Sequence, residues 1–166
     1  MMTVWQLYLA KYAEECHEVV EALLGVIEDS GNIQSIRHAH EELDDLRAVM
    51  EELSVYGLDI SEIMPTDVDR ASEADQLGVI SNLMKRLSAA GKIALKAQQF
   101  GLDEVCPGIP FSNIQRLGIE SKKIIDLIQD LNAGGFNYKT SDQRVNNKKA
   151  KMQHYMKYSQ SLRCVK

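Results

Sequence analysis

Two pairs of acidic residues, each pair three residues apart, stand early in this 166-residue sequence. Glu15 and Glu18 form the first pair, directly after Glu14, and Glu42 and Asp45 form the second. Residues three apart on a helix share a face, with Cβ atoms about 5–6 Å apart, so each pair would project its oxygens side by side. Four converging carboxylates repel one another unless a cation lies among them. Hard oxygen ligands of this kind favour Mg²⁺ or Mn²⁺, so the spacing predicts a metal site.

The predicted metal also indicates a class of substrate. Mg²⁺ binds few carboxylates and takes its other ligands from water and substrate phosphates, which makes a nucleotide a natural partner. The plainer alternative is that both acidic pairs lie on solvated helix faces. Other site types fit less well: Glu14-x-x-His17 is half of a di-iron pattern with no second copy, and no HExxH zinc motif is present. The sequence also has no Walker-type glycine loop and no GxSxG motif.

Helical periodicity gives the acidic pairs their positions. Apolar residues at spacings of three and four predict one helix of roughly 25 residues and a second that ends near residue 53. The break between them, at residues 29–32, is short, so the two helices would be antiparallel neighbours. This arrangement would bring the two acidic pairs together.

The rest of the chain also predicts helices. Residues 56–75 are typical of a connection, and a third helix is expected from about residue 77 to 99. A loop rich in Gly and Pro follows, and Ser112 or Asn113 would cap a fourth helix that Gly134-Gly135 ends. The remainder is basic and would end in one more helix. No segment shows the alternation that strands require.

The sequence repeats itself weakly. Residues 12–24 register on 83–95 at an offset of 71, and residues 41–53 register on 119–131 at an offset of 78. We therefore expect an all-α fold with a four-helix-bundle-like core, built from two pseudo-repeated helix–loop–helix halves, plus a basic C-terminal helix. Residues 1–166 would form a single domain, with a metal-binding half (1–56), a degenerate half (76–133) and a basic tail (134–166).

The second half lacks the acids of the first. At the registered positions Lys85, Arg86, Ala89 and Lys123 replace Glu14, Glu15, Glu18 and Asp45, and Glu42 alone survives, as Glu120. Such residues cannot hold a cation, so we expect one metal site per chain. The replacement bases would either face phosphates or form a structural layer of salt bridges.

Charge is divided unequally along the chain. Residues 1–75 carry 18 acids and 4 bases, whereas residues 76–166 carry 6 acids and 15 bases, within a net charge of -5. One half could gather a cation and the other an anion, or the halves could simply attract each other. The candidates for contact with substrate are in the basic tail and the third helix: Lys148, Lys151, Tyr155, Asn82 and Lys85. Trp5 and Gln6 are further candidates that would line one base pocket with Asn82.

Several partners and compartments are disfavoured. No apolar run reaches the roughly 18 residues of a membrane span, and the N-terminus has no basic region typical of a signal peptide. Cys16, Cys106 and Cys164 are widely spaced and odd in number, which favours reduced thiols in a cytoplasmic protein. An isoelectric point near 5.4 and the absence of a nucleic-acid reader motif disfavour nucleic-acid binding.

Two segments carry a resemblance to a known family. YAEECHEVVEAL followed by HEELDDLRAVMEEL resembles the EExxE…ExxD signature of the MazG-like family of all-α nucleoside triphosphate pyrophosphohydrolases. ALKAQQFGLDEVCPG…SNIQRL is similar to the second half of phage-type and bacterial members, so the resemblance covers roughly residues 5–133. It implies Mg²⁺-dependent cleavage of NTPs or dNTPs to NMP and pyrophosphate, and a homo-oligomer that is a dimer or a tetramer.

The resemblance also implies roles for individual acids. Glu15, Glu18, Glu42 and Asp45 would be the metal ligands. Glu14 would help with a second metal or orient the attacking water, and Glu14 or Glu18 would position or deprotonate that water.

Two alternatives remain open. Within the same fold the substrate could be that of a dUTPase, a dCTPase or a phosphoribosyl-ATP pyrophosphohydrolase, because base choice depends on a few pocket residues. In another class, the chain would be a non-catalytic helical module that binds a nucleotide or a protein.

Overall fold

The structure is a computed structural model that describes residues 2–59 and 75–162. It contains five helices, namely α1 (Val4–Glu28), α2 (Ile33–Ser54), α3 (Gln76–Phe100), α4 (Asn113–Ala133) and α5 (Asp142–Ser161). The described residues form no β-strand, so the predicted all-α fold is confirmed. Most of the predicted connection at 56–75 lies outside the described residues, as does the end of the basic tail.

Polar side chains define where the helices begin. Thr3 caps α1 and Ser112 caps α4, each in a capping box with the glutamine three residues later. Asn32 caps α2, and the Ser141 hydroxyl accepts a hydrogen bond from the Arg144 N–H at the start of α5. The predicted cap at Ser112 and the predicted end before Gly134 are both confirmed.

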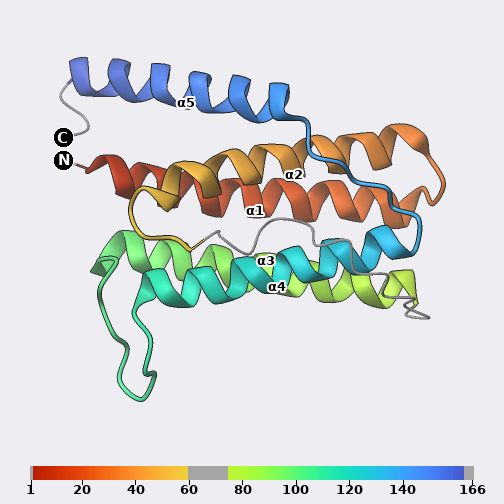
Figure 1. Cartoon of the computed structure of the whole chain (residues 1–166), viewed down its shortest axis with the longest axis horizontal. Helices are drawn as coiled ribbons and strands as arrows, with labels where there is room; N and C mark the ends of the chain where they lie inside the picture. Colours follow the sequence, from red (N-terminus) through yellow and green to blue (C-terminus); the bar gives the residue numbers. More distant parts are fainter. Residues whose placement is uncertain (1, 60–74, 163–166) are drawn as a thin grey trace.

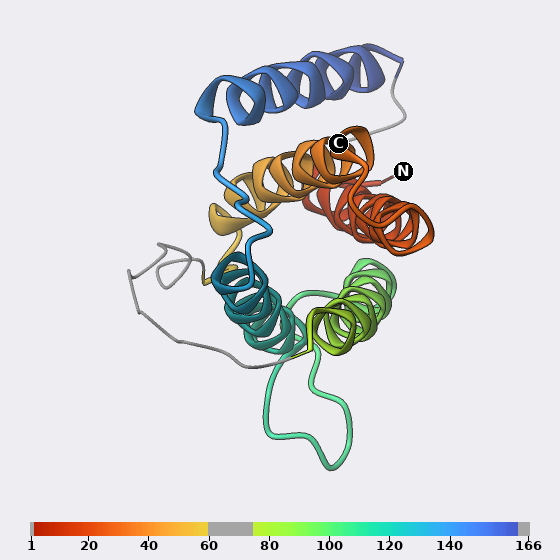
Figure 2. The ribbon, with the colours of Figure 1, turned by 90° about the vertical axis from the view of Figure 1, so that its right-hand side faces the viewer.

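The helices pack in three layers, which Figure 1 shows from top to bottom. The hairpin of α1 and α2 forms the middle layer, the hairpin of α3 and α4 lies below it, and α5 lies above. α1 packs against both α2 and α3, and α3 packs against α4, while α5 packs against α2. Figure 2 shows the same arrangement turned by 90°, with α5 outside the four-helix core. The predicted bundle with an added C-terminal helix is therefore confirmed.

Burial follows the predicted register between α1 and α3. Five buried positions of α1 correspond, at the offset of 71, to five buried positions of α3: Tyr12, Cys16, Val19, Ala22 and Leu23 match Leu83, Leu87, Ala90, Ile93 and Ala94. α1 and α3 therefore present equivalent faces to one shared core.

Two smaller expectations can be compared with the structure. None of the described helices has an apolar stretch sufficient to cross a bilayer. Cys16 is buried, Cys106 is partly exposed, and both are free thiols, whereas Cys164 lies outside the described residues.

Candidate metal centre

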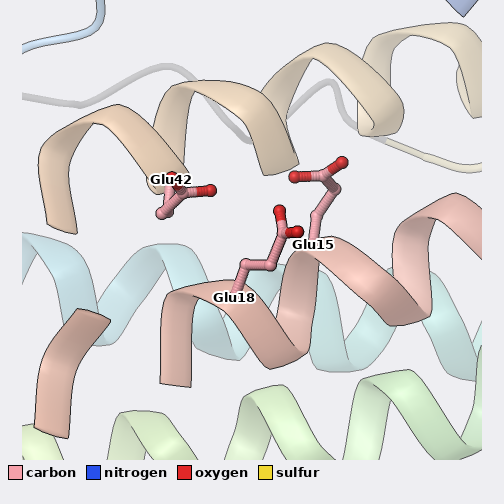
Figure 3. Close-up of side chains that lie close together, drawn as sticks. All are labelled: Glu15, Glu18 and Glu42. Carbon is pink, nitrogen blue, oxygen red and sulfur yellow. The ribbon is translucent and has the colours of Figure 1, made fainter. Parts of the chain in front are cut away.

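Three of the four predicted ligands converge between α1 and α2. Glu15 and Glu18 project from α1 toward Glu42 on α2, and one carboxylate oxygen from each lies within 4.8 Å of the others (Figure 3). The convergence follows from helix geometry, because Glu15 and Glu18 share a face of α1 and the turn at residues 29–32 makes α2 antiparallel to it. The three acids thus offer three oxygen donors to one point.

Glu15 is the most deeply buried member of this cluster, with 1% of its surface exposed. Its Oε1 lies 2.8 Å from the Lys148 Nζ, an ion pair that lacks hydrogen-bond geometry. Its Oε2 has no hydrogen-bond partner in the described part of the chain. The pKa of Glu15 is raised to about 7, chiefly by burial; Lys148 opposes the rise and Glu18 adds to it. A buried carboxylate oxygen without a partner is costly, so this atom is suited to a cation.

Glu42 completes the cluster from α2. Burial raises its pKa above the ordinary value, and the neighbouring charges of Asp45 and Glu18 raise it further. The exposed His38 lies one turn earlier, with Nδ1 3.5 Å from the Glu42 Oε1, and opposes this effect. The carboxylates therefore repel one another in the absence of a further cation.

Asp45 lies beside the cluster rather than within it. Its Oδ2 accepts a hydrogen bond from the Lys148 Nζ at 2.9 Å, and its Oδ1 lies 3.2 Å from the Arg144 Nε. Arg144 also reaches Glu41, at 3.5 Å. Asp45, the fourth predicted ligand, is thus paired with two bases of α5. It lies outside the group of three glutamates whose oxygens are within 4.8 Å of one another.

The charges at this site are unequal. Four acids, Glu15, Glu18, Glu42 and Asp45, face two bases of α5, Lys148 and Arg144. When all four acids are ionised, a surplus of two negative charges remains. A divalent cation would neutralise this surplus, and its preferred donors are the oxygens present here.

The linker before α5, residues 134–141, is hydrogen-bonded to α2 and thereby positions Lys148 and Arg144. The buried Asp44 accepts hydrogen bonds from the Tyr138 hydroxyl at 2.9 Å and from the Ser141 N–H at 3.2 Å. The Arg47 guanidinium donates to the Thr140 hydroxyl at 3.0 Å. Burial raises the pKa of Asp44, while these two donors oppose the rise. Because Ser141 caps α5, these contacts fix the start of the helix one turn before Arg144.

The second half holds an ion-pair cluster at the registered positions. The Arg86 guanidinium lies 3.5 Å from the Glu120 Oε2, and the Lys123 Nζ donates to the Glu120 Oε1 at 2.7 Å. Arg86 and Lys123 stand where the first half has Glu15 and Asp45, and Glu120 corresponds to Glu42. Two bases surround one acid, so this half has no negative surplus to offer a metal. These ion pairs match the expected structural layer of salt bridges.

The remaining predicted site residues lie away from the three glutamates. Glu14 is exposed and pairs with Lys11 on α1. Lys151 and Tyr155 are exposed on α5 and contact none of the four acids within the described residues. Lys85 lines a shallow hollow beside Val20, on the side of α1 that faces α3.

The structure does not bring Trp5, Gln6 and Asn82 together. α1 and α3 are antiparallel, since the Gln6 side chain donates to the Gln98 carbonyl at 2.9 Å while Val20 lies beside Lys85. Asn82 and Gln98 are 16 residues apart on α3, which is roughly 24 Å at the rise of an α-helix. The prediction that these residues line one pocket is therefore wrong, because it overlooked the antiparallel packing.

A separate cavity lies on another side of α2. It has a volume of about 460 Å³ and lies between α2, α4 and the linker. Leu43, Leu46 and Met50 from α2 line it together with isoleucines of α4. None of the three clustered glutamates lines this cavity, so it is not part of the candidate metal centre.

Two residues that matter at this site were missed by the sequence reasoning. Arg144 contacts Asp45, and Asp44 anchors the linker. A signal for Arg144 was present, because it precedes Lys148 by one turn and α5 buries Val145 and Met152 on the neighbouring stripe. For Asp44 no sequence signal exists, since its partners come from a segment about 95 residues later.

No protein-family model, curated protein or solved structure matches this chain. The resemblance to the MazG-like family therefore stays a prediction that depends on the sequence pattern.

Proposed function

We propose that this protein is a magnesium-dependent nucleoside triphosphate pyrophosphohydrolase of MazG-like type, which converts an NTP or dNTP to NMP and pyrophosphate. The observation that carries the proposal is the convergence of Glu15, Glu18 and Glu42 within 4.8 Å, with a buried oxygen of Glu15 left without a hydrogen-bond partner. The reaction type, release of pyrophosphate, is proposed because the EExxE…ExxD spacing resembles the MazG-like signature.

The residues present fit Mg²⁺ or Mn²⁺. Glu15, Glu18 and Glu42 would hold the ion through carboxylate oxygens, which are the donors these ions prefer. Few protein ligands leave coordination positions for water and phosphate oxygens, as nucleotide chemistry requires. Asp45 is held by Lys148 and Arg144 and would complete the set only if those contacts change.

The chemistry divides between the metal and the chain's own side chains. Bound Mg²⁺ would offset the negative charge that develops on the phosphate oxygens. Lys148 and Arg144 would contact the phosphates, because both side chains border the cluster and carry positive charge. Glu18, which is only partly buried, would position the attacking water and accept its proton. Glu14 is less suited to that role, because it is exposed and paired with Lys11.

The test is product analysis with a panel of NTPs and dNTPs, in Mg²⁺ and in EDTA. We expect NMP and pyrophosphate in Mg²⁺ and no products in EDTA. Glu15→Gln and Glu42→Gln should each lower turnover about 100-fold or more. Glu21→Gln is the matched control, because Glu21 lies on the same helix and pairs only with His17 in the described structure.

Two outcomes would contradict the proposal. Release of NDP and phosphate would indicate a different bond specificity. Mn²⁺ binding without turnover of any nucleotide would favour a non-catalytic nucleotide-binding module.

A further inference from the structure

The Lys148 ammonium occupies a position that a metal ion would compete for. Its Nζ lies 2.8 Å from the Glu15 Oε1 and 2.9 Å from the Asp45 Oδ2, so it bridges one acid of each predicted pair. The side chain is largely buried between α5 and the α1–α2 hairpin. Burial alone would lower the pKa of Lys148, but Glu15 and Asp45 raise it well above its ordinary value. The two ion pairs therefore place the positive charge of Lys148 between one acid of each predicted pair.

One positive charge is too little for the acids that surround it. Lys148 forms an ion pair with one oxygen of Glu15, and neither oxygen of that carboxylate has a hydrogen bond within the described residues. Glu18 and Glu42 receive no hydrogen bond from Lys148. A divalent ion at the three glutamates would add two charges next to the ammonium, and two cations in that space repel each other.

The helix that carries Lys148 can accommodate such an exchange. α5 packs against α2 and buries few apolar side chains, namely Val145, Met152 and Met156. Most of its other contacts with the bundle are ion pairs and hydrogen bonds of long side chains. A lysine side chain has a flexible stem of four carbons, so its ammonium can move by several ångströms without displacement of the helix.

We propose that Lys148 is a resident counter-ion of the metal centre, which holds Glu15 and Asp45 when the metal is absent and transfers to a substrate phosphate when the metal binds. The inference depends on the proposed function for its second step only. The first step, competition between the ammonium and the metal, requires no catalysis.

Competition and phosphate contact predict opposite effects of one substitution. Removal of the ammonium should strengthen metal binding, because a competing charge is gone and Asp45 becomes available as a ligand. The same change should weaken nucleotide binding, because a phosphate contact is lost. A lysine with a purely structural role would weaken both or change neither.

The experiment is calorimetric titration of the full chain with Mn²⁺, without nucleotide, for wild type, Lys148→Met, Lys148→Arg and Lys149→Met. We expect Lys148→Met to bind Mn²⁺ about tenfold more tightly than wild type, since a neighbouring unit charge has been removed. Lys148→Arg keeps the charge and should stay within about twofold of wild type. Lys149→Met is the matched control, because Lys149 is the next residue and pairs with Glu51 and Glu52 instead.

Steady-state kinetics on the same variants test the second step. We expect the KM for the nucleotide to rise at least about tenfold in Lys148→Met, with a smaller change in Lys149→Met. Circular dichroism melts, with and without Mn²⁺, show whether each variant is folded. The gain in Tm from Mn²⁺ should be larger for Lys148→Met than for wild type.

The outcomes separate this inference from the proposed function. Equal or weaker Mn²⁺ binding by folded Lys148→Met, with wild type active, would overturn the counter-ion role and leave the enzyme activity standing. An unchanged KM would overturn the transfer to phosphate. If wild type binds Mn²⁺ but no nucleotide reacts, tighter binding by Lys148→Met would still support the competition while the proposed activity fails.

Discussion

The two halves of the molecule place different charges at equivalent positions of one bundle. In the first half Glu15, Glu18 and Glu42 converge, and two bases of α5 only partly balance them and Asp45. In the second half Arg86 and Lys123 surround the single acid Glu120. The first cluster has a negative surplus and the second has a positive one.

The fold accommodates either arrangement of charge. The buried apolar positions of α1 and α3 correspond, so the backbone arrangement does not depend on the charges beside them. In the second half, the Arg86 guanidinium supplies a positive charge from within the chain. In the first half, a cation from solution would supply that charge. The proposed metal binding would account for the surplus of acids in the first half.

The largest effect should come from equivalent substitutions in the two halves. Glu42→Gln removes a proposed ligand, and we expect turnover to fall about 100-fold or more, since the metal contributes several kcal/mol of charge stabilisation. Glu120→Gln removes the corresponding acid of the second half and should leave turnover within about twofold. Pyrophosphate release under saturating nucleotide measures both. Equal losses would show that Glu42 has no role that Glu120 lacks.

A second metal site could be installed in the second half. The triple variant Arg86→Glu, Ala89→Glu, Lys123→Asp restores the acids of the first half around Glu120. Without metal we expect a loss of stability on the order of 2 kcal/mol, because the ion pairs of Glu120 become repulsions. Mn²⁺ should recover that loss, and the number of ions bound per chain should double. Urea unfolding and calorimetry give the two readouts.

The pH dependence of the free energy of unfolding should report the raised pKa of Glu15. Its pKa is about 7 in the folded chain and about 4.5 in an unfolded one, so the folded state binds more protons between these values. The stability from this group is therefore full below pH 4.5 and is lost as pH rises through 7. In EDTA, wild type should lose roughly 1–3 kcal/mol relative to Glu15→Gln across this window. Parallel curves would contradict the raised pKa.

The smallest effect concerns the core that joins the halves. The Tyr12 hydroxyl of the first half and the Ser121 hydroxyl of the second lie 2.8 Å apart and are buried. Tyr12→Phe and Ser121→Ala should each cost about 1 kcal/mol, because each leaves a buried hydroxyl unpaired. The double variant should cost less than the sum of the two. Additive losses in urea unfolding would show that the two side chains are not coupled.

The sequence predicted the parts of this protein that depend on local spacing. Apolar residues at helical spacing predicted the bundle, since that spacing produces one buried face per helix. The spacing of three residues in each acidic pair, with a short turn between the helices, predicted that Glu15, Glu18, Glu42 and Asp45 meet, and three of these four converge. The register between the halves predicted which acids have no counterpart.

The position of α5 beside this cluster depends on contacts between residues far apart in the sequence. Lys148 was expected near phosphate, but its contact with Glu15 and Asp45 depends on the anchoring of the linker by Asp44. Trp5 and Asn82 were expected to share a pocket, and the antiparallel packing of α1 and α3 separates them. These contacts join residues distant in sequence, and local periodicity carries no information about how helices pack against one another.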